Sequence, residues 1–467
     1  MGLRLGFSGR FVVVLALTFI ILLLPVPEGL STNGKRALAA FAFTGTIFAL
    51  QPVPLPFAGL MVPVALVALG VADSAQAFET LSRPIIILIL GSLFLAEALR
   101  KHGITRRLAL TSIVASRGDV NLLLLGMMGI AALLSMWMEN TATAAVLIPV
   151  ALTISNQIPD QEKARELLVQ LVLGIAYAAS LGGMATITGA ASNAVASEFL
   201  AEIRPWTFVD WMKYGIPALV VIFPLTWWVL KRLVSVTVKS LDIELARKEL
   251  ENIGPIRPVE WEILVVMNAA ILFWIAGSFV EPLLDLPATL MSPAVVGMVA
   301  VAYLSLRGII EWEDVKGVSW GMFFAIAAGL ALGEALIRTG ATQWLTGLVS
   351  PIISGSPSLL SLFFLIFLSA LLTNVINNAT VAAVFVPILI SLAVQEPNLN
   401  AAHLVLPLTL ATTFGYSLPS ASGRMALISA TGIVDRRDVL RFGIILTALS
   451  SVALAFLFYL LTVVRLI

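Results

Sequence analysis

Two short polar sequences interrupt long apolar stretches of this chain, and they hold side chains well suited to binding an ion. Glu139-Asn140 divides the segment 120–158, and Asn377-Asn378 divides the segment 357–395. A connection of two residues predicts a re-entrant hairpin, in which two half-length helices meet at a tip inside the membrane. The second arm of each hairpin then offers unpaired N–H groups and a positive dipole end, which attract an anion.

Two further apolar stretches, 165–200 and 402–430, are too long for single helices. Each is interrupted by Gly, Ser, Thr or Pro, at 182–193 and at 415–424. Irregular backbone at membrane depth is tolerated where it lines a cavity or is buried in protein. Such broken helices offer free carbonyl groups, which suit a small cation, and further helix N-termini.

Composition excludes several other classes of protein. Of the 467 residues, 59% are hydrophobic and only 12% are charged, and the mean hydropathy is +1.01. Soluble domains carry about twice that share of charge, so a soluble enzyme or a nucleic-acid binder is excluded. There is no cysteine, the histidines are His102 and His403, and no hydrolase motif is present. We expect neither an enzyme nor a bound cofactor, apart from a coupling ion.

The apolar stretches predict an all-α polytopic membrane protein with about eleven transmembrane helices and the two hairpins. Lys and Arg gather at 100–107, 231–257 and 435–437, and the positive-inside rule places these segments in the cytoplasm. The N-terminus is then cytoplasmic, the C-terminus lies outside, and the expected location is the cell (inner) membrane. The first apolar run has no cleavage site and is interpreted as a retained span. The predicted organisation is an N-terminal segment with the first span (1–35), a first repeat (36–235), a cytoplasmic linker with an amphipathic helix (236–259) and a second repeat (260–467).

The two halves resemble each other at a nearly constant offset. Asn140 and Asn378 occupy matching places within similar sequences, and the breaks that begin at Gly183 and Gly415 follow them at almost the same spacing. The predicted topology gives the two copies opposite orientations. Inverted repeats with interrupted helices at matching positions indicate a secondary transporter whose site lies where the repeats meet.

These motifs resemble the divalent anion:sodium symporter family, which carries dicarboxylates, citrate or sulfate, and the resemblance covers nearly the whole chain. The family has Ser-Asn-Thr at each hairpin tip, followed by Ala-Thr-Ala-Ala and a Pro, and the run from Asn140 to Ala145 with Pro149 is similar to it. The run from Gly182 to Asn193 resembles the family's Gly-rich break. The resemblance implies a homodimer in the lipid bilayer. Each protomer would have a scaffold and a domain that moves as an elevator, and one sodium would lie beside each tip.

The expected site residues combine those that the resemblance implies with other polar and charged residues of the tips and breaks. The resemblance itself implies Asn140, Thr141 and Asn378 for the anion, and Ser135, Asn140, Gly189, Thr373 and Asn378 for sodium. The expected substrate ligands are Asn140, Thr141, Ser192, Asn193, Asn378, Ser422 and Arg424. The expected cation ligands are Ser135, Glu139, Asn140, Gly189, Thr373, Asn377 and Asn378.

The chain departs from the family pattern at two charged positions. Glu139 stands where the family has Ser, and it is expected to ligate a cation, take up a proton or pair with a basic residue. Arg424 stands in the second break, where the family's Asn is missing. It is expected either to replace the second sodium with a fixed charge or to bind the anion bidentately. We therefore expect fewer coupling sodium ions than the family pattern implies.

The leading functional hypothesis is cation-coupled transport of a small divalent anion, such as succinate, malate or sulfate, by an elevator mechanism. A proton-coupled carrier, a cation/proton antiporter and an oxyanion permease of similar hairpin fold remain alternatives. An anion channel is a weaker one, because a channel does not need two inverted broken-helix sites.

Overall fold

The structure of the protein is a computed structural model, which describes residues 7–283, 289–353, 358–396 and 399–464. Within those ranges the chain is helical, and the only strand-like pairing is an isolated bridge between Asp119 and Ser240. The predicted all-α class is therefore confirmed. The helices of the first half are α1 (Phe7–Leu23), α2 (Thr32–Leu50), α3 (Leu55–Ala68), α4 (Ser74–Phe78), α5 (Pro84–Lys101), α6 (Ile104–Ala115), α7 (Val120–Ser135), α8 (Asn140–Ser155), α9 (Gln161–Gly183), α10 (Ala191–Ala201) and α11 (Phe208–Leu233).

The second half of the chain follows the helix α12 (Glu244–Ile253). Its helices are α13 (Pro258–Leu283), α14 (Pro293–Leu306), α15 (Trp320–Arg338), α16 (Ala341–Ile353), α17 (Leu359–Leu372), α18 (Asn378–Gln395), α19 (Ala401–Ala411), α20 (Gly423–Thr431) and α21 (Arg436–Val463). Short 3₁₀ turns η1 (Glu79–Ser82), η2 (Trp312–Gly317), η3 (Thr412–Phe414) and η4 (Pro419–Ala421) complete the set.

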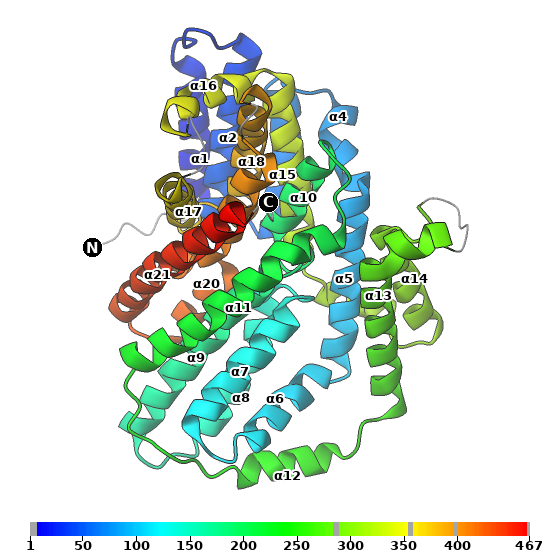
Figure 1. Cartoon of the computed structure of the whole chain (residues 1–467), viewed down its shortest axis with the longest axis vertical. Coiled ribbons are helices and arrows are strands. Elements are labelled where there is room, and N and C mark those ends of the chain that lie inside the picture. The colour runs from blue at the N-terminus through cyan, green and yellow to red at the C-terminus, as the bar shows by residue number, and fades with distance from the viewer. Residues whose placement is uncertain (1–6, 284–288, 354–357, 397–398, 465–467) are drawn as a thin grey trace.

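Two helical pairs stand at the positions predicted for hairpins. α7 and α8 have 16 residues each, about 24 Å, which is shorter than the roughly 30 Å hydrocarbon core. Their partners α17 and α18 have 14 and 18 residues. In Figure 1 the first pair lies in the lower half of the molecule near α12, and the second lies in the upper half near α16.

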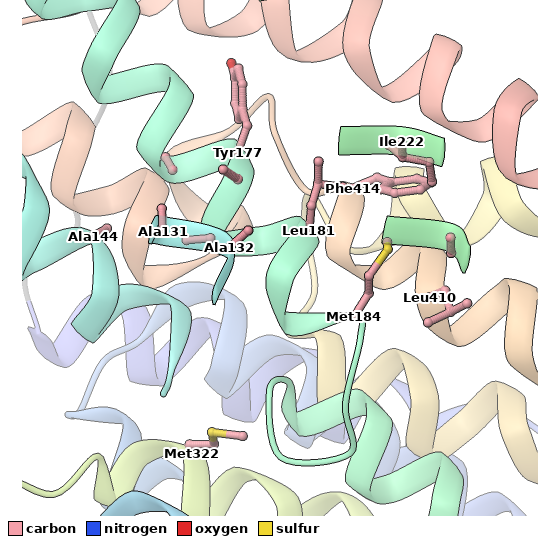
Figure 2. Close-up of a cluster of buried hydrophobic side chains, with 14 of the residues drawn as sticks. Ala131, Ala132, Ala144, Tyr177, Leu181, Met184, Ile222, Met322, Leu410 and Phe414 are labelled. Atoms are coloured by element: carbon pink, nitrogen blue, oxygen red, sulfur yellow. The ribbon is translucent and has the colours of Figure 1, made fainter. Parts of the chain in front are cut away.

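The two interrupted helices form much of the core. Every residue from Gln170 to Gly183 in α9 is buried, and so is every residue from Ala402 to Ala411 in α19. A helix that is apolar on all sides belongs inside a larger structure. Figure 2 shows Leu181, at the end of α9, close to Phe414 of the second break, in one apolar cluster.

Length and composition allow six described helices to cross a membrane, or seven if the bent pair formed by Ser74–Ser82 and Pro84–Lys101 counts as one span. The six include α18, which the sequence assigned to a hairpin arm. Further apolar helices of 10–17 residues lie among them. The count of about eleven spans therefore stays a prediction.

Candidate functional site

A cavity of about 360 Å³ lies where both hairpin tips and both helix breaks meet. The tips contribute Glu139, Asn140, Thr141, Asn377 and Asn378, and the breaks contribute Gly189, Ala190, Ala191, Ala421, Ser422, Gly423 and Arg424. The remaining wall consists of Phe48, Gln51 and Leu55 from the α2–α3 region and Ser319, Gly321, Met322 and Ala325 around the start of α15. Segments from opposite halves of the chain thus form one site.

Four helices begin at this cavity, namely α8, α10, α18 and α20. The first turns of α8 and α18 are capped by side chains, because Glu139 accepts from the N–H of Ala142 and Asn377 accepts from that of Ala379. The starts of α10, after Ala190, and of α20, after Ser422, have no side-chain cap. Unpaired N–H groups and four positive dipole ends therefore surround the cavity, an arrangement that favours an anion.

A cluster of oxygen atoms lies beside the first tip. The side-chain oxygen of Asn140 accepts a hydrogen bond from Ser135. A Cβ placed on Gly183 would lie 2.7 Å from that oxygen and 2.8 Å from the carbonyl oxygen of Gly189. A Cβ on Gly189 would lie 2.9 Å from the carbonyl oxygen of Ser135. This set, called the first oxygen cluster below, brings together the hard oxygen ligands that a small cation such as sodium requires.

The second tip has a similar arrangement with one difference. Thr373 donates to the side-chain oxygen of Asn378 and, at 2.9 Å, to the carbonyl of Thr412. The difference is a charged side chain, Arg424, which is 1% exposed. Its Nη2 donates to the carbonyl oxygen of Thr413 at 3.3 Å and to that of Gly415 at 3.2 Å. Within the described part of the chain, its buried Nε has no hydrogen-bond partner. A permanent cation thus binds carbonyl groups of the second break.

Glu139 acts as a helix cap, a role that the sequence analysis did not foresee. One carboxylate oxygen accepts from the Thr141 hydroxyl at 2.6 Å, and the other accepts from the Ala142 N–H at 3.1 Å. Among the described residues no ion pair within 4 Å involves Glu139 or Arg424, although the two charges interact through space. The carboxylate remains in the wall of the cavity.

Ser192 and Asn193, which were expected to bind substrate, lie outside the cavity lining and are fully buried. The Asn193 amide donates to the carbonyls of Gly183 at 2.8 Å and Thr186 at 2.7 Å, and Ser192 accepts from the Thr412 hydroxyl at 2.7 Å. Both side chains therefore fix the breaks in place. Ser135 and Thr373 also lie behind the lining, each bonded to the Asn of its tip.

The sequence analysis missed the part of the wall that comes from the α2–α3 region and the start of α15. Gln51 ends α2 with a left-handed backbone conformation (φ 43°), which is uncommon for a residue other than Gly. The signal was a polar residue followed by Pro52 and Pro54 within an apolar region. Such a break at membrane depth is itself a cavity-lining signature.

Apolar helices around a cavity at which four helices begin are typical of a membrane transporter for a small ion. Comparison with known families agrees, because the model described as "Sodium:sulfate symporter transmembrane region" matches residues 8–464. The chain belongs to this sodium:sulfate symporter family, as its sequence motifs predicted.

Several relatives are similar over nearly their whole length. An uncharacterized transporter of Haemophilus influenzae is 30% identical, with 98% of each chain covered. The sodium-dependent dicarboxylate transporter SdcS of Staphylococcus saprophyticus is 27% identical, covering 94% of this chain and 88% of its own. The solved YdaH transporter of Alcanivorax borkumensis, which has an unusual topology, matches with a TM-score of 0.52 at 13% identity, covering 98% of this chain and 97% of its own. That last likeness concerns the fold alone.

Proposed function

We propose that this protein is a secondary transporter that moves a small dicarboxylate across the cell membrane together with sodium. The observation that carries the proposal is the convergence of four helix N-termini on one cavity beside a cluster of oxygen ligands. An anion and a cation would then bind within a few ångströms of each other. Such proximity couples their binding energies, because each ion offsets the desolvation of the other.

The anion site is the cavity itself. Asn140 and Asn378 provide side-chain amide donors at the tips, Ser422 adds a hydroxyl, and the uncapped starts of α10 and α20 provide N–H groups. Thr141 also lines the cavity, but its hydroxyl proton is donated to Glu139. Two tips facing one space suit a ligand with two negative ends. The volume of about 360 Å³ accommodates a four-carbon dicarboxylate with some water, whereas sulfate would leave much of it unfilled. We therefore favour succinate or malate over sulfate, in line with the name of the Staphylococcus relatives, sodium-dependent dicarboxylate transporter.

For transport, we propose that the hairpins and the broken helices move as one unit. Support comes from their mutual packing, because α8 contacts α20 and α10 contacts α18. The static part would comprise α2, α3, α5 and α13 to α15, and a second copy of the chain would complete a homodimer. Arg83 connects the two parts, since it pairs with Glu198 at 3.0 Å and Glu202 at 3.2 Å on and just after α10 and with Glu334 on α15.

The test is uptake of radiolabelled succinate into proteoliposomes, with and without an inward sodium gradient. We expect uphill uptake that needs sodium and is inhibited by malate more strongly than by sulfate. Uptake driven by a proton gradient alone would favour proton coupling. A current that needs no cation gradient would indicate a channel.

The variant Asn140→Ala tests whether succinate uptake depends on the first tip. It removes a donor to a charged ligand and an oxygen of the first oxygen cluster, so succinate affinity should fall by about 1.5–3 kcal/mol, roughly ten- to more than a hundredfold. Asn268→Ala is the matched control, because Asn268 lies on α13 and donates to its own helix at the Leu264 carbonyl, 2.7 Å away. Equal uptake by both variants would remove the first tip from the mechanism.

A further inference from the structure

We infer that the guanidinium of Arg424 occupies the place of a second coupling cation, so that the carrier takes one mobile sodium, at the first oxygen cluster. This inference rests on the proposed function and specifies its ion stoichiometry.

The two tips are built from equivalent parts. Ser135 and Asn140 in the first half correspond to Thr373 and Asn378 in the second, and the offset along the chain is the same for both pairs. In both halves a hydroxyl at the end of the first arm donates to the amide oxygen that begins the second arm. The second tip therefore has the components from which a cation site is built at the first.

The two breaks differ in the charge of the group that holds them. In the first break, the neutral amide of Asn193 donates to the carbonyls of Gly183 and Thr186. In the second break, Met425 follows Gly415 at the spacing at which Asn193 follows Gly183, and its neighbour Arg424 donates to the carbonyls of Gly415 and Thr413. The same structural task is thus carried out by a neutral group in one half and by a cation in the other.

A buried positive charge changes what the second tip can bind. Arg424 is 1% exposed, and its Nη2 donates hydrogen bonds to two backbone carbonyl groups at the second break. A sodium ion bound beside this break would meet electrostatic repulsion from the buried charge. Meanwhile the guanidinium supplies to the anion the positive charge that a bound ion would supply. The first oxygen cluster, built from neutral groups, keeps its need for a mobile cation.

Two measurements on the purified full-length protein test this inference. The first is the Hill coefficient for sodium in succinate uptake. The second is the sodium dependence of thermal stability without any anion, with choline replacing sodium at constant ionic strength. The wild type should give a Hill coefficient near one and a stabilisation that follows single-site binding.

Two substitutions separate charge from structure. Arg424→Gln keeps a donor for the break carbonyls but removes the charge, so the Hill coefficient should rise toward two and the stabilisation per tenfold sodium should approximately double. Arg424→Lys keeps the charge and should retain single-ion behaviour. If Arg424→Gln does not fold, the wild type and Arg424→Lys still decide the question.

Each outcome bears on the inference. Two-ion behaviour in the wild type overturns it, as does single-ion behaviour in an active Arg424→Gln variant or the absence of any stabilisation by sodium. The proposed function fails differently, by an absence of succinate uptake under every cation gradient. In that case the anion-free thermal titration still counts the sodium ions.

Discussion

At the scale of single residues, Glu139 presents a conflict that the structure partly explains. A carboxylate in the wall of a proposed anion site repels the substrate, yet this one is held by the Thr141 hydroxyl and the Ala142 N–H. An acidic side chain at a helix N-terminus is stabilised by the dipole and by those two hydrogen bonds. The cap explains why the charge is tolerated at this position. It also allows the charge of Glu139 to be removed while the cap is kept.

Glu139→Ser should keep the cap, because Ser is a preferred N-cap residue, and should remove the charge. A like charge about 8–15 Å away at an effective dielectric constant near 20 costs about 1–2 kcal/mol. Succinate affinity should therefore improve by roughly five- to thirtyfold, as measured by the KM of uptake. Asn377→Ser is the matched control, since it changes the equivalent cap of α18 without changing charge. Weaker binding in Glu139→Ser would instead assign the carboxylate to the coupling cation.

At the scale of helices, the start of α20 packs against the tip of the first hairpin. An ideal Cβ on Gly423 would lie 3.3 Å from the Cβ of Thr141 and 2.5 Å from its hydroxyl oxygen. Only glycine allows so close an approach, and the contact joins the two halves of the chain at the cavity. It also offers a direct chemical test of the predicted arrangement.

The double variant Thr141→Cys/Gly423→Cys should form a disulfide under mild oxidation, because the separation of its Cβ atoms is close to the 3.5–4.5 Å that disulfides need. The chain has no cysteine of its own, so no other pair can form within it. Cross-linking is read from gel mobility after protease cleavage at a site inserted in the linker. Thr153→Cys/Gly423→Cys is the control, since Thr153 lies about 18 Å farther along α8. Equal cross-linking of both pairs would contradict the tip contact.

The charged cluster around Arg83 leads to a prediction about stability. Three carboxylates face this one guanidinium, and among the described residues the only other cation paired with them is Arg338, 3.8 Å from Glu334. Arg83→Gln should lower the free energy of unfolding by about 1–3 kcal/mol, because it leaves partly buried carboxylates unpaired. Arg106→Gln breaks the more exposed pair with Glu249 and should cost less than about 1 kcal/mol. Thermal melting of both variants in detergent compares them, and equal melting temperatures would show that the cluster is no stronger than a surface pair.

The sequence predicted these elements unevenly, for physical reasons. Tips such as Asn377-Asn378 were visible because two polar residues inside an apolar run have few structural explanations. Ser192 and Asn193 looked as suitable as Ser422, but which side chains face a cavity depends on the rotation of a helix about its axis. Gln51 was missed because its neighbourhood was interpreted as the gap between two ordinary spans. Local signals thus located the breaks, while tertiary packing decided which of their atoms reach the site.

At the scale of the whole molecule, the two helical pairs α7–α8 and α17–α18 approach the cavity from opposite ends. Figure 1 places α6 to α9 and α12 at one end, and α16 to α18 with α1 and α2 at the other. Contacts recur across the halves, since α14 packs on α5 as α3 packs on α15. In the proposed mechanism, one group of helices moves relative to the other and exposes the site to each side in turn. The side of the membrane on which each hairpin lies then depends on which end faces the cytoplasm.

The distribution of basic residues predicts that α12 lies on the cytoplasmic face. The linker 236–259 carries Lys239, Arg247, Lys248 and Arg257, and short basic segments remain on the cytoplasmic side during insertion. Because the chain has no cysteine, a single introduced cysteine reports its side without background. Lys248 is exposed on α12, and Glu28 is exposed in the turn after α1, so each can be replaced by cysteine. With a membrane-impermeant maleimide on intact cells, Glu28→Cys should be labelled and Lys248→Cys should react only after the membrane is permeabilised. The reverse pattern would place α12 outside the cell and the turn after α1 inside it. If neither residue is labelled before permeabilisation, both segments lie inside, which would contradict the predicted first span.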